Sequence, residues 1–224
     1  MRLFESGMLS WRVGGPSLLG IFFVIKKSSM IRMILDTRGR NKFFQPHAST
    51  RHPSGAAFVE MDASPNGPVY FASGDIKDCF YHLGVPPGLE QWFSLPWIHR
   101  RHLPKNLTGI TSEDPDAWIV PLLTVLPMGW SWSLYFAQMA HETLSRRAGC
   151  SDSNHILAKM ESIPLNEGGC RMAIYVDNYS IAGRDRREVL ERQKAHTRTL
   201  ISHGLPVHEE TSNQTEVDYV WATL

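Results

Sequence analysis

Two aspartates occupy positions where a carboxylate is costly unless its charge is compensated. Asp75 ends the hydrophobic run VYFASGD at 69–75, and Asp177 follows the hydrophobic run at 171–176, 102 residues later. If both runs are neighbouring strands of one sheet, the two side chains converge, and such a pair of carboxylates has the chemistry that Mg²⁺ requires. The alternative is that Asp75 caps a helical turn and Asp177 is only a turn residue.

Basic residues are concentrated at the start of the chain. The net charge of all 224 residues is +1, yet the first 52 residues hold nine Lys or Arg against Glu5 and Asp36. That segment therefore carries +7 and the remainder carries −6. The asymmetry fits one phosphate-facing region and one region that concentrates carboxylates, and a solvated basic surface accounts for it equally well.

Hydrophobic periodicity predicts the elements that position these residues. We expect strands at 20–25, 30–35, 69–75, 91–97, 118–126, 171–176, 179–182 and 217–221, and helices at 131–147 and 185–203. Ser131 is placed to cap the first long helix, Gly149 to end it, and Asp177-Asn178 to supply the positive φ of a tight hairpin. In the second helix we expect six residues to face inward: Val189, Leu190, Gln193, His196, Leu200 and Ile201. This order of elements indicates an α+β fold, with an antiparallel sheet carrying helices on one face.

Composition excludes several classes of protein. With 42% hydrophobic and 20% charged residues, the chain is not predominantly disordered. The longest apolar run, 18–25, is well short of the ~20 residues of a membrane-spanning helix. Three scattered cysteines favour neither a disulfide framework nor a zinc site, so we expect an intracellular protein of the nucleus or cytoplasm that is not secreted.

Four segments resemble the motifs of one polymerase family, in that family's order. They are VIKKSSMIRMILDTRGRNK at 24–42, SGDIKDCFYHLGVPPG at 73–88, VLPMGWSWSLYFAQ at 125–138 and YVDN at 175–178. They resemble, respectively, the finger hairpin, the first catalytic motif, the motif that positions template and nucleotide, and the Tyr-x-Asp-Asp hairpin of reverse transcriptases. The chain thus resembles the fingers and palm of a retroelement reverse transcriptase.

The resemblance implies a metal centre. Asp75 and Asp177 would hold two Mg²⁺ ions, with Mn²⁺ as a substitute, and the main-chain carbonyl of Ile76 would complete the metal shell. Asn178 stands where the family has the second Asp of the hairpin, which removes one negative charge from the site. We therefore expect weakened metal binding or low activity.

The resemblance also implies substrate-binding residues. Phe80, five residues after Asp75, would exclude a ribose 2′-hydroxyl, with ordinary core packing as its alternative. Gly129 would let the backbone approach the template–nucleotide pair, while Met128 replaces a common Gln and loses its hydrogen bond. Lys26 or Lys27, together with Arg32, would bind the β and γ phosphates of the nucleotide. The alternative is that these residues form a solvated basic turn.

We therefore expect an α+β polymerase fold with a fingers-like basic region at 1–68 and a palm-like catalytic region at 69–224. The palm-like region would carry a finger insertion near 86–126, and the segment 204–213 resembles the family's next motif but has no Lys. No thumb or ribonuclease H region follows Leu224, so these would be supplied elsewhere. The expected function is that of a nucleotidyltransferase, an RNA-directed DNA polymerase fragment using deoxynucleoside triphosphates and a primed RNA or DNA template, without a membrane. The alternative is an inactive retroelement remnant that still binds nucleic acid.

Overall fold

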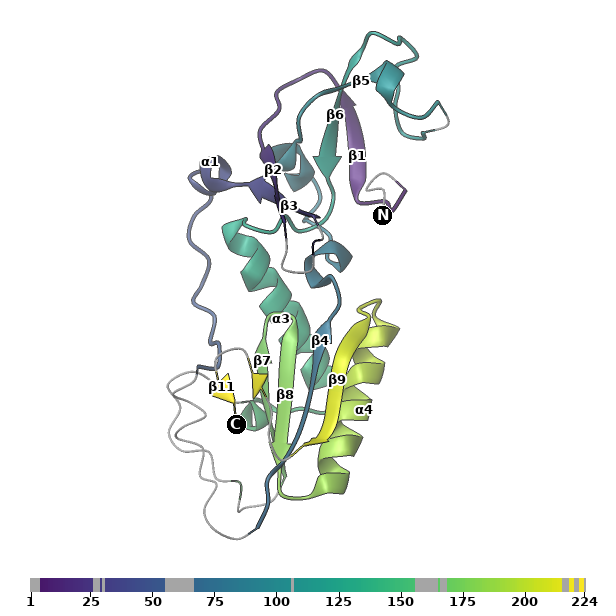
Figure 1. Ribbon diagram of the computed structural model, residues 1–224. Helices are drawn as coiled ribbons and strands as arrows, with labels where there is room; N and C mark the ends of the chain where they lie inside the picture. The colour runs from purple at the N-terminus through teal and green to yellow at the C-terminus, as the bar shows by residue number, and fades with distance from the viewer. Residues whose placement is uncertain are drawn as a thin grey trace. The chain divides into compact units, whose positions relative to one another are not determined.

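The chain forms two compact units, each assembled from two segments of the sequence. The computed structural model describes residues 5–25, 29, 31–54, 67–105, 107–155, 165, 169–214, 218–219 and 222–223 (Figure 1). Unit 1 comprises Met1–His47 and Phe80–Ser133, and unit 2 comprises Ala48–Cys79 and Leu134–Leu224. The assignment of 1–68 to a fingers-like region and of 69–224 to a palm-like region stays a prediction.

Unit 1 contains a small sheet and a separate hairpin. The antiparallel sheet has the order β1-β6-β5, from Leu9–Val13, Trp118–Leu123 and Ile98–His99. Strands β2 (Gly20–Ile25) and β3 (Ile31–Asp36) form the hairpin, and α1 (Arg38–Asn41) follows it. Short 3₁₀ turns lie at η1 (Cys79–His82), from Phe80 onward, η2 (Leu89–Phe93) and η3 (Arg100–His102). The predicted finger hairpin therefore exists as two paired strands.

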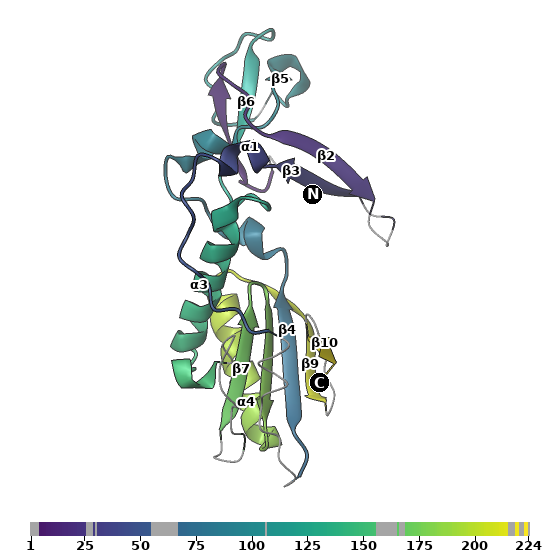
Figure 2. The same ribbon diagram turned by 90° about the vertical axis from the view of Figure 1, so that its left-hand side faces the viewer.

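Unit 2 is built on a four-stranded antiparallel sheet of order β7-β8-β4-β9. Its strands are Cys170–Tyr175, Asn178–Gly183, Tyr70–Ile76 and Val207–Gln214. Helix α3 (Ser131–Arg147), from Leu134 onward, and α4 (Arg186–Ser202) cover the same face of this sheet (Figures 1 and 2). The remaining elements are η4 (Asp152–Asn154) and the paired strands β10 (Asp218–Tyr219) and β11 (Ala222–Thr223). The predicted α+β class with an antiparallel sheet is confirmed.

Helix α3 has the predicted bounds but a different N-terminal cap. The side chain of Asn41 accepts a hydrogen bond from Ser131 N–H at 3.1 Å and donates to the carbonyl of Gly129 at 3.0 Å. Ser131 is therefore the first helical residue and not the capping residue that the sequence predicted. At the other end Gly149 has φ 91°, which only a glycine adopts readily, and the helix ends there as predicted.

The strand predicted at 91–97 is wrong. Gly88 has φ 89°, and Leu89 N–H donates to the carbonyl of Pro86 at 3.0 Å, so the chain continues as the 3₁₀ turn η2. This turn buries Phe93 completely and packs it 4.9 Å from the ring of Trp130, which is 3% exposed. Apolar residues that the sequence predicted as a strand are instead part of an aromatic core within unit 1.

Unit 2 contains one strand that was not predicted, and its helix α4 needs one correction. Strand β9 was not predicted, because its sequence VHEETSNQ is polar and its place in the sheet depends on main-chain pairing with β4. Ile201 of α4 is 56% exposed, since the buried residues Val189, Gln193, His196 and Leu200 define a narrower stripe. Part of the strand predicted at 217–221 lies outside the described residues, and β10 covers the rest. None of the helices described is both long enough and apolar enough to span a bilayer.

Candidate active site

Strands β4 and β8 bring the two predicted catalytic aspartates to one place. Asp75 pairs with Asn178 in the antiparallel register, and Asp177 occupies the turn immediately before Asn178. Ile76 N–H donates to the carbonyl of Asp177 at 2.9 Å, which ties the turn to the end of β4. The neighbouring strands expected from the sequence are therefore present, and residues 75–76 and 177–178 form one site within unit 2.

Glycine is required beside this site for a steric reason. Gly74 pairs with Tyr179, and a Cβ on Gly74 would lie 2.6 Å from the phenolic oxygen of that residue. The Tyr179 ring is fully buried, and its hydroxyl donates to a carboxylate oxygen of Glu210 at 3.1 Å. Only a residue without a side chain lets this ring cross the strand directly before Asp75.

Burial and like charge make the aspartate pair electrostatically unfavourable. Burial raises the pKa of Asp75, and the charge of Asp177 raises it further. Burial also raises the pKa of Asp177. The negative potential of the two aspartates also acts on the thiol of Cys79. Burial and the charges of Asp177 and Asp75 raise the pKa of this thiol to about 12. A bound cation would relieve this excess of negative potential.

A residue that the sequence analysis missed contacts Asp75. His208 of β9 donates from Nε2 to Asp75 Oδ1 at 2.7 Å, and this bond opposes the rise in the pKa of that carboxyl. The β9 register shifts between Thr211 and His208, and Glu209 has φ 51°, as expected of a bulge. A bulge re-aims side chains, and here it accompanies the approach of His208 to the aspartate. The signal for His208 in the sequence is the motif HEE at 208–210, which lies within the segment that resembles the family's next motif but has no lysine.

The donor set fits a hard divalent cation that also takes ligands from substrate. Two carboxylates and the main-chain oxygen of Ile76 are oxygen donors of the kind that Mg²⁺ prefers. Among the side chains that the structure describes, no three His, Cys, Asp or Glu gather as a possible metal-binding group. Asn178 Nδ2 donates to Asp177 Oδ1 at 3.2 Å, so the replaced acidic position now offers a donor in place of a charge. Phosphate or water oxygens would have to complete any cation's coordination.

The positive φ of the hairpin falls on an unexpected residue. We predicted it for Asp177-Asn178, but Val176 has φ 56° and Asn178 already belongs to β8. This conformation is unusual for a β-branched side chain, whose Cβ substituents crowd the backbone there. Asn at 178 is thus not explained by backbone conformation.

The predicted substrate-binding residues that the structure describes belong to unit 1. Arg32 is exposed on β3 and pairs with Val24 of β2, Phe80 is partly buried in η1, and Met128 is 42% exposed. Lys26 and Lys27 lie outside the described residues.

Gly129 has a structural requirement of its own. Its φ is 107°, and a Cβ would lie 2.9 Å from the hydroxyl of Thr37 and 3.5 Å from the carbonyl of Leu35. The corner between β3 and α1 therefore occupies the space that a side chain would need. Glycine at this position follows from packing within unit 1, independently of the predicted role near a nucleotide.

Comparison with known proteins identifies the fold. No model of a known protein family matches the sequence. A solved foamy viral protease–reverse transcriptase in complex with double-stranded DNA matches 99% of this chain, with a TM-score of 0.67 and 16% identity. The native prototype foamy virus protease–reverse transcriptase matches 97% of this chain, with a TM-score of 0.65 and 17% identity.

The chain has a reverse transcriptase fold. A second foamy viral protease–reverse transcriptase complex with double-stranded DNA gives a TM-score of 0.66 at 16% identity over 99% of this chain. The chain covers 31%, 24% and 37% of these three solved proteins, so it spans about a quarter to a third of their length. The reverse transcriptase fold suggested by the four sequence motifs is confirmed for this portion.

Proposed function

We propose that this chain is the fingers and palm part of an RNA-directed DNA polymerase, which adds deoxynucleotides to a primer. The observation that carries the proposal is the meeting of Asp75 and Asp177 at the ends of paired strands, where burial and mutual repulsion raise the pKa of Asp75. When bound there, two Mg²⁺ or Mn²⁺ ions supply activation of the primer hydroxyl and neutralisation of phosphate charge. The reverse transcriptase fold supports this reaction class.

Other residues receive their roles from the same proposal. Arg32, with Lys26 or Lys27, binds the triphosphate, and Phe80 excludes the ribose 2′-hydroxyl. Met128 and Gly129 lie against the template–nucleotide pair. The partners are a primed RNA or DNA template and deoxynucleoside triphosphates. Two of the foamy viral structures were solved with double-stranded DNA, which supports a nucleic-acid partner for this fold. We place the protein inside the cell.

The second candidate is a catalytically inactive remnant that retains nucleic-acid binding. Asn178 favours it, because an amide replaces the second carboxylate of the hairpin and its Nδ2 donates to Asp177. His208 on Asp75 adds to this, since it already compensates one of the two carboxylates without a metal. Measured polymerase activity separates the two candidates.

Primer extension on poly(rA)–oligo(dT) tests the proposal. We expect Asp75→Asn and Asp177→Asn each to lower extension by about 100-fold or more. Loss of a residue that only hydrogen-bonds to a metal ligand costs about 10-fold to 100-fold, and loss of the ligand itself should cost more. Asp78→Asn is the matched control, since Asp78 is exposed in the same motif and its φ of 54° suits asparagine. The far-UV circular dichroism of all three should match the wild type. Equal extension by wild type and both site variants would remove the metal-site assignment.

A further inference from the structure

Val176, directly before Asp177, is held in its unusual conformation from both sides. A β-branched residue rarely adopts φ 56°, so surrounding contacts must impose it. Both main-chain groups of Val176 are engaged by buried side chains of α3. Gln138 Oε1 accepts from Val176 N–H at 2.7 Å, and His141 Nδ1 donates to the Val176 carbonyl at 2.8 Å. The side chains of Gln138 and His141 are each 1% exposed.

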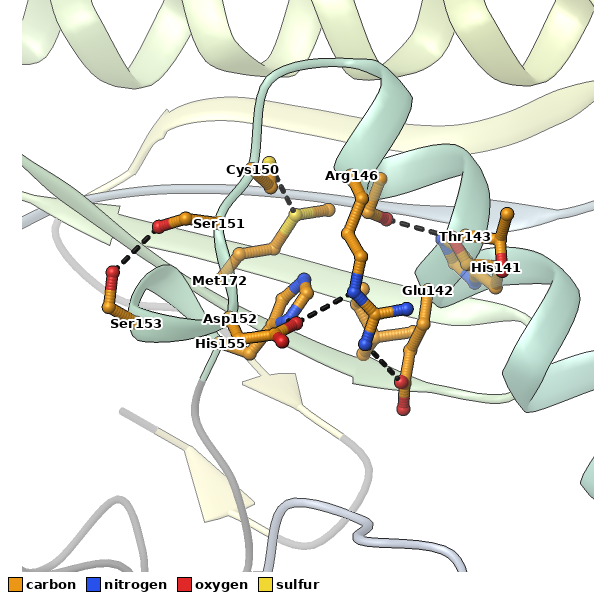
Figure 3. A network of polar contacts seen from close by, with 12 residues as sticks. His141, Glu142, Thr143, Arg146, Cys150, Ser151, Asp152, Ser153, His155 and Met172 are labelled. Atoms are coloured by element: carbon orange, nitrogen blue, oxygen red, sulfur yellow. Dashed lines mark hydrogen bonds and ion pairs between the residues drawn. The ribbon is translucent and has the colours of Figure 1, made fainter.

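The first of these contacts ends a continuous polar chain along α3. Asp152 accepts from Arg146 Nε at 2.7 Å, and Arg146 Nη2 donates to Glu142 Oε2 at 3.1 Å (Figure 3). Glu142 Oε1 accepts from Gln138 Nε2 at 2.7 Å. The same Nε2 donates to the Ile174 carbonyl at 3.1 Å. Because a carboxylate and a carbonyl only accept, both contacts fix the amide orientation of Gln138 and turn Oε1 toward Val176 N–H. The amide is thus aligned before it meets the hairpin.

The second contact ends a buried pair of imidazoles. A carbonyl only accepts, so His141 must carry its proton on Nδ1. Burial lowers the pKa of His141 to about 4, so the ring is neutral near pH 7 and its Nε2 is bare. His196 Nε2 lies 3.0 Å away and must donate, while its Nδ1 lies 3.4 Å from Ser145 Oγ. With Nε2–H on His196 and Nδ1–H on His141, each hydrogen bond from α4 to the Val176 carbonyl has one donor and one acceptor.

We propose that Gln138 and His141, backed by Glu142–Arg146 and by His196, are positioning residues that aim the Asp177 carboxylate. They act through the main chain of Val176, while Ile76 N–H fixes the carbonyl of Asp177 on its other side. The backbone is therefore fixed both immediately before Asp177 and at Asp177 itself. The inference rests on the proposed function, because that function makes the direction of the Asp177 carboxylate important for metal binding. The two chains of hydrogen bonds are observed in the structure whatever the function is.

Mn²⁺ binding measured by electron paramagnetic resonance tests the aim without requiring catalysis. Gln138→Leu and His141→Leu should weaken Mn²⁺ affinity by about 10-fold to 100-fold, as loss of outer partners does at metal sites. His141→Asn places an amide donor near the position of Nδ1 and should stay within about threefold of wild type. Thr143→Ala is the control on α3, because among the described residues the Thr143 hydroxyl bonds its own helix, at the Met139 carbonyl. In primer extension the leucine variants should lower kcat while leaving KM for the nucleotide unchanged.

Nitrogen-15 NMR of histidine-labelled protein tests the geometry independently. It should show the Nδ1–H tautomer for His141 and the Nε2–H tautomer for His196, and His196→Gln, which keeps a donor near Nε2, should preserve the His141 signal. A protonated Nε2 on neutral His141 would overturn the inference. So would folded leucine variants that bind Mn²⁺ like wild type, or a His141→Asn variant that loses binding as fully as His141→Leu.

The two proposals fail in different ways. If wild type binds no Mn²⁺ and Asp177→Asn changes nothing, the proposed function fails. The positioning inference is then decided by two other measurements. These are the tautomers of His141 and His196 and the protection of the Val176 N–H from hydrogen exchange. Should the leucine variants not fold, His141→Asn and His196→Gln carry the test. If the wild type binds Mn²⁺ but the Val176 main-chain N–H exchanges rapidly with solvent hydrogen, the proposed function stands and the positioning role is removed.

Discussion

At the residue scale, the decisive feature of the site is which groups sit beside Asp177. The sequence motif YVDN predicted Asp177 as a site residue. The structure adds its surroundings, which are an asparagine amide, a half-buried carboxyl partner and a strained valine. Each of these changes the charge or the direction of one carboxylate. Single substitutions here therefore give the sharpest predictions.

Restoring a carboxylate at position 178 should strengthen cation binding. Asn178→Asp removes the donor to Asp177 Oδ1 and adds a negative charge beside it, and nearby charge favours a bound dication. We expect the Mg²⁺ concentration for half-maximal primer extension to fall. Asn178→Ala is the control, because it loses the same hydrogen bond without adding charge. An equal Mg²⁺ requirement in both variants would show that charge at 178 is unimportant, and inertness of wild type and both variants would favour the remnant.

The buried imidazole pair should make the protein sensitive to acid. Burial lowers the pKa of His141 to about 4 and that of His196 well below its usual value. Because unfolded histidines bind protons at about pH 6.5, this stability is complete above that pH and is lost as pH falls toward 4. The loss is about 1.4 kcal/mol per pH unit for each group that protonates only on unfolding.

Urea denaturation between pH 7.5 and 4.5 measures this loss. The raised pKa of Asp75 and of Asp177 acts in the opposite direction, because protonation of those carboxyls in mild acid favours the folded state. The double variant His141→Asn, His196→Gln keeps the carboxyls and removes the two titrating rings, so its curve should be flatter than the wild-type curve. Parallel curves would assign the acid sensitivity to other groups, such as the buried His155, whose pKa is also lowered by burial.

At the element scale, the start of α3 depends on a residue that is distant in sequence. Asn41→Ala removes both hydrogen bonds that join α1 to the helix start, and loss of a cap costs about 1 kcal/mol. We expect Tm to fall by roughly 2 to 4 °C in a scanning calorimeter. Asn41→Asp keeps the acceptor for Ser131 N–H and should lose less. If Ser131→Ala lowers Tm and Asn41→Ala does not, the cap is Ser131 after all.

At the scale of the whole molecule, the charge distribution sets the expected mode of nucleic-acid binding. The first 52 residues carry +7 and the others −6, so we expect few phosphate contacts and weak binding of primer–template. Each contact releases counterions, with a log–log salt slope of about −0.9 on B-form DNA. Affinity measured by fluorescence anisotropy should therefore fall as salt rises, with a slope that is the sum over these contacts.

Two arginines of unit 1 provide a matched test of this charge distribution. Arg32→Ala should reduce the salt slope by about one, because Arg32 is exposed in the basic segment. Arg101→Ala should leave it unchanged, because Arg101 faces Asp116 at 3.6 Å. Tight binding that is insensitive to salt would contradict the electrostatic account.

The sequence by itself determined the features that depend on local chain chemistry. Helical spacing from 131 to 147 and the glycine at 149 gave the bounds of α3, since periodicity and C-terminal capping act over a few residues. The hydrophobic runs ending at Asp75 and before Asp177 gave the paired strands that carry the candidate site. The strand predicted at 91–97 failed for a related reason, because a short apolar run does not specify its period when Gly88 starts a 3₁₀ turn.

Only the tertiary structure decided which distant groups share one environment. His208 reaches Asp75 through a bulge in a polar strand, and Asn41 caps a helix that begins 90 residues later. Val176 takes a conformation that its residue type disfavours, because buried side chains of α3 bind both of its main-chain groups. These features follow from register and packing between segments far apart in sequence, where hydrogen bonds to buried partners outweigh local preference.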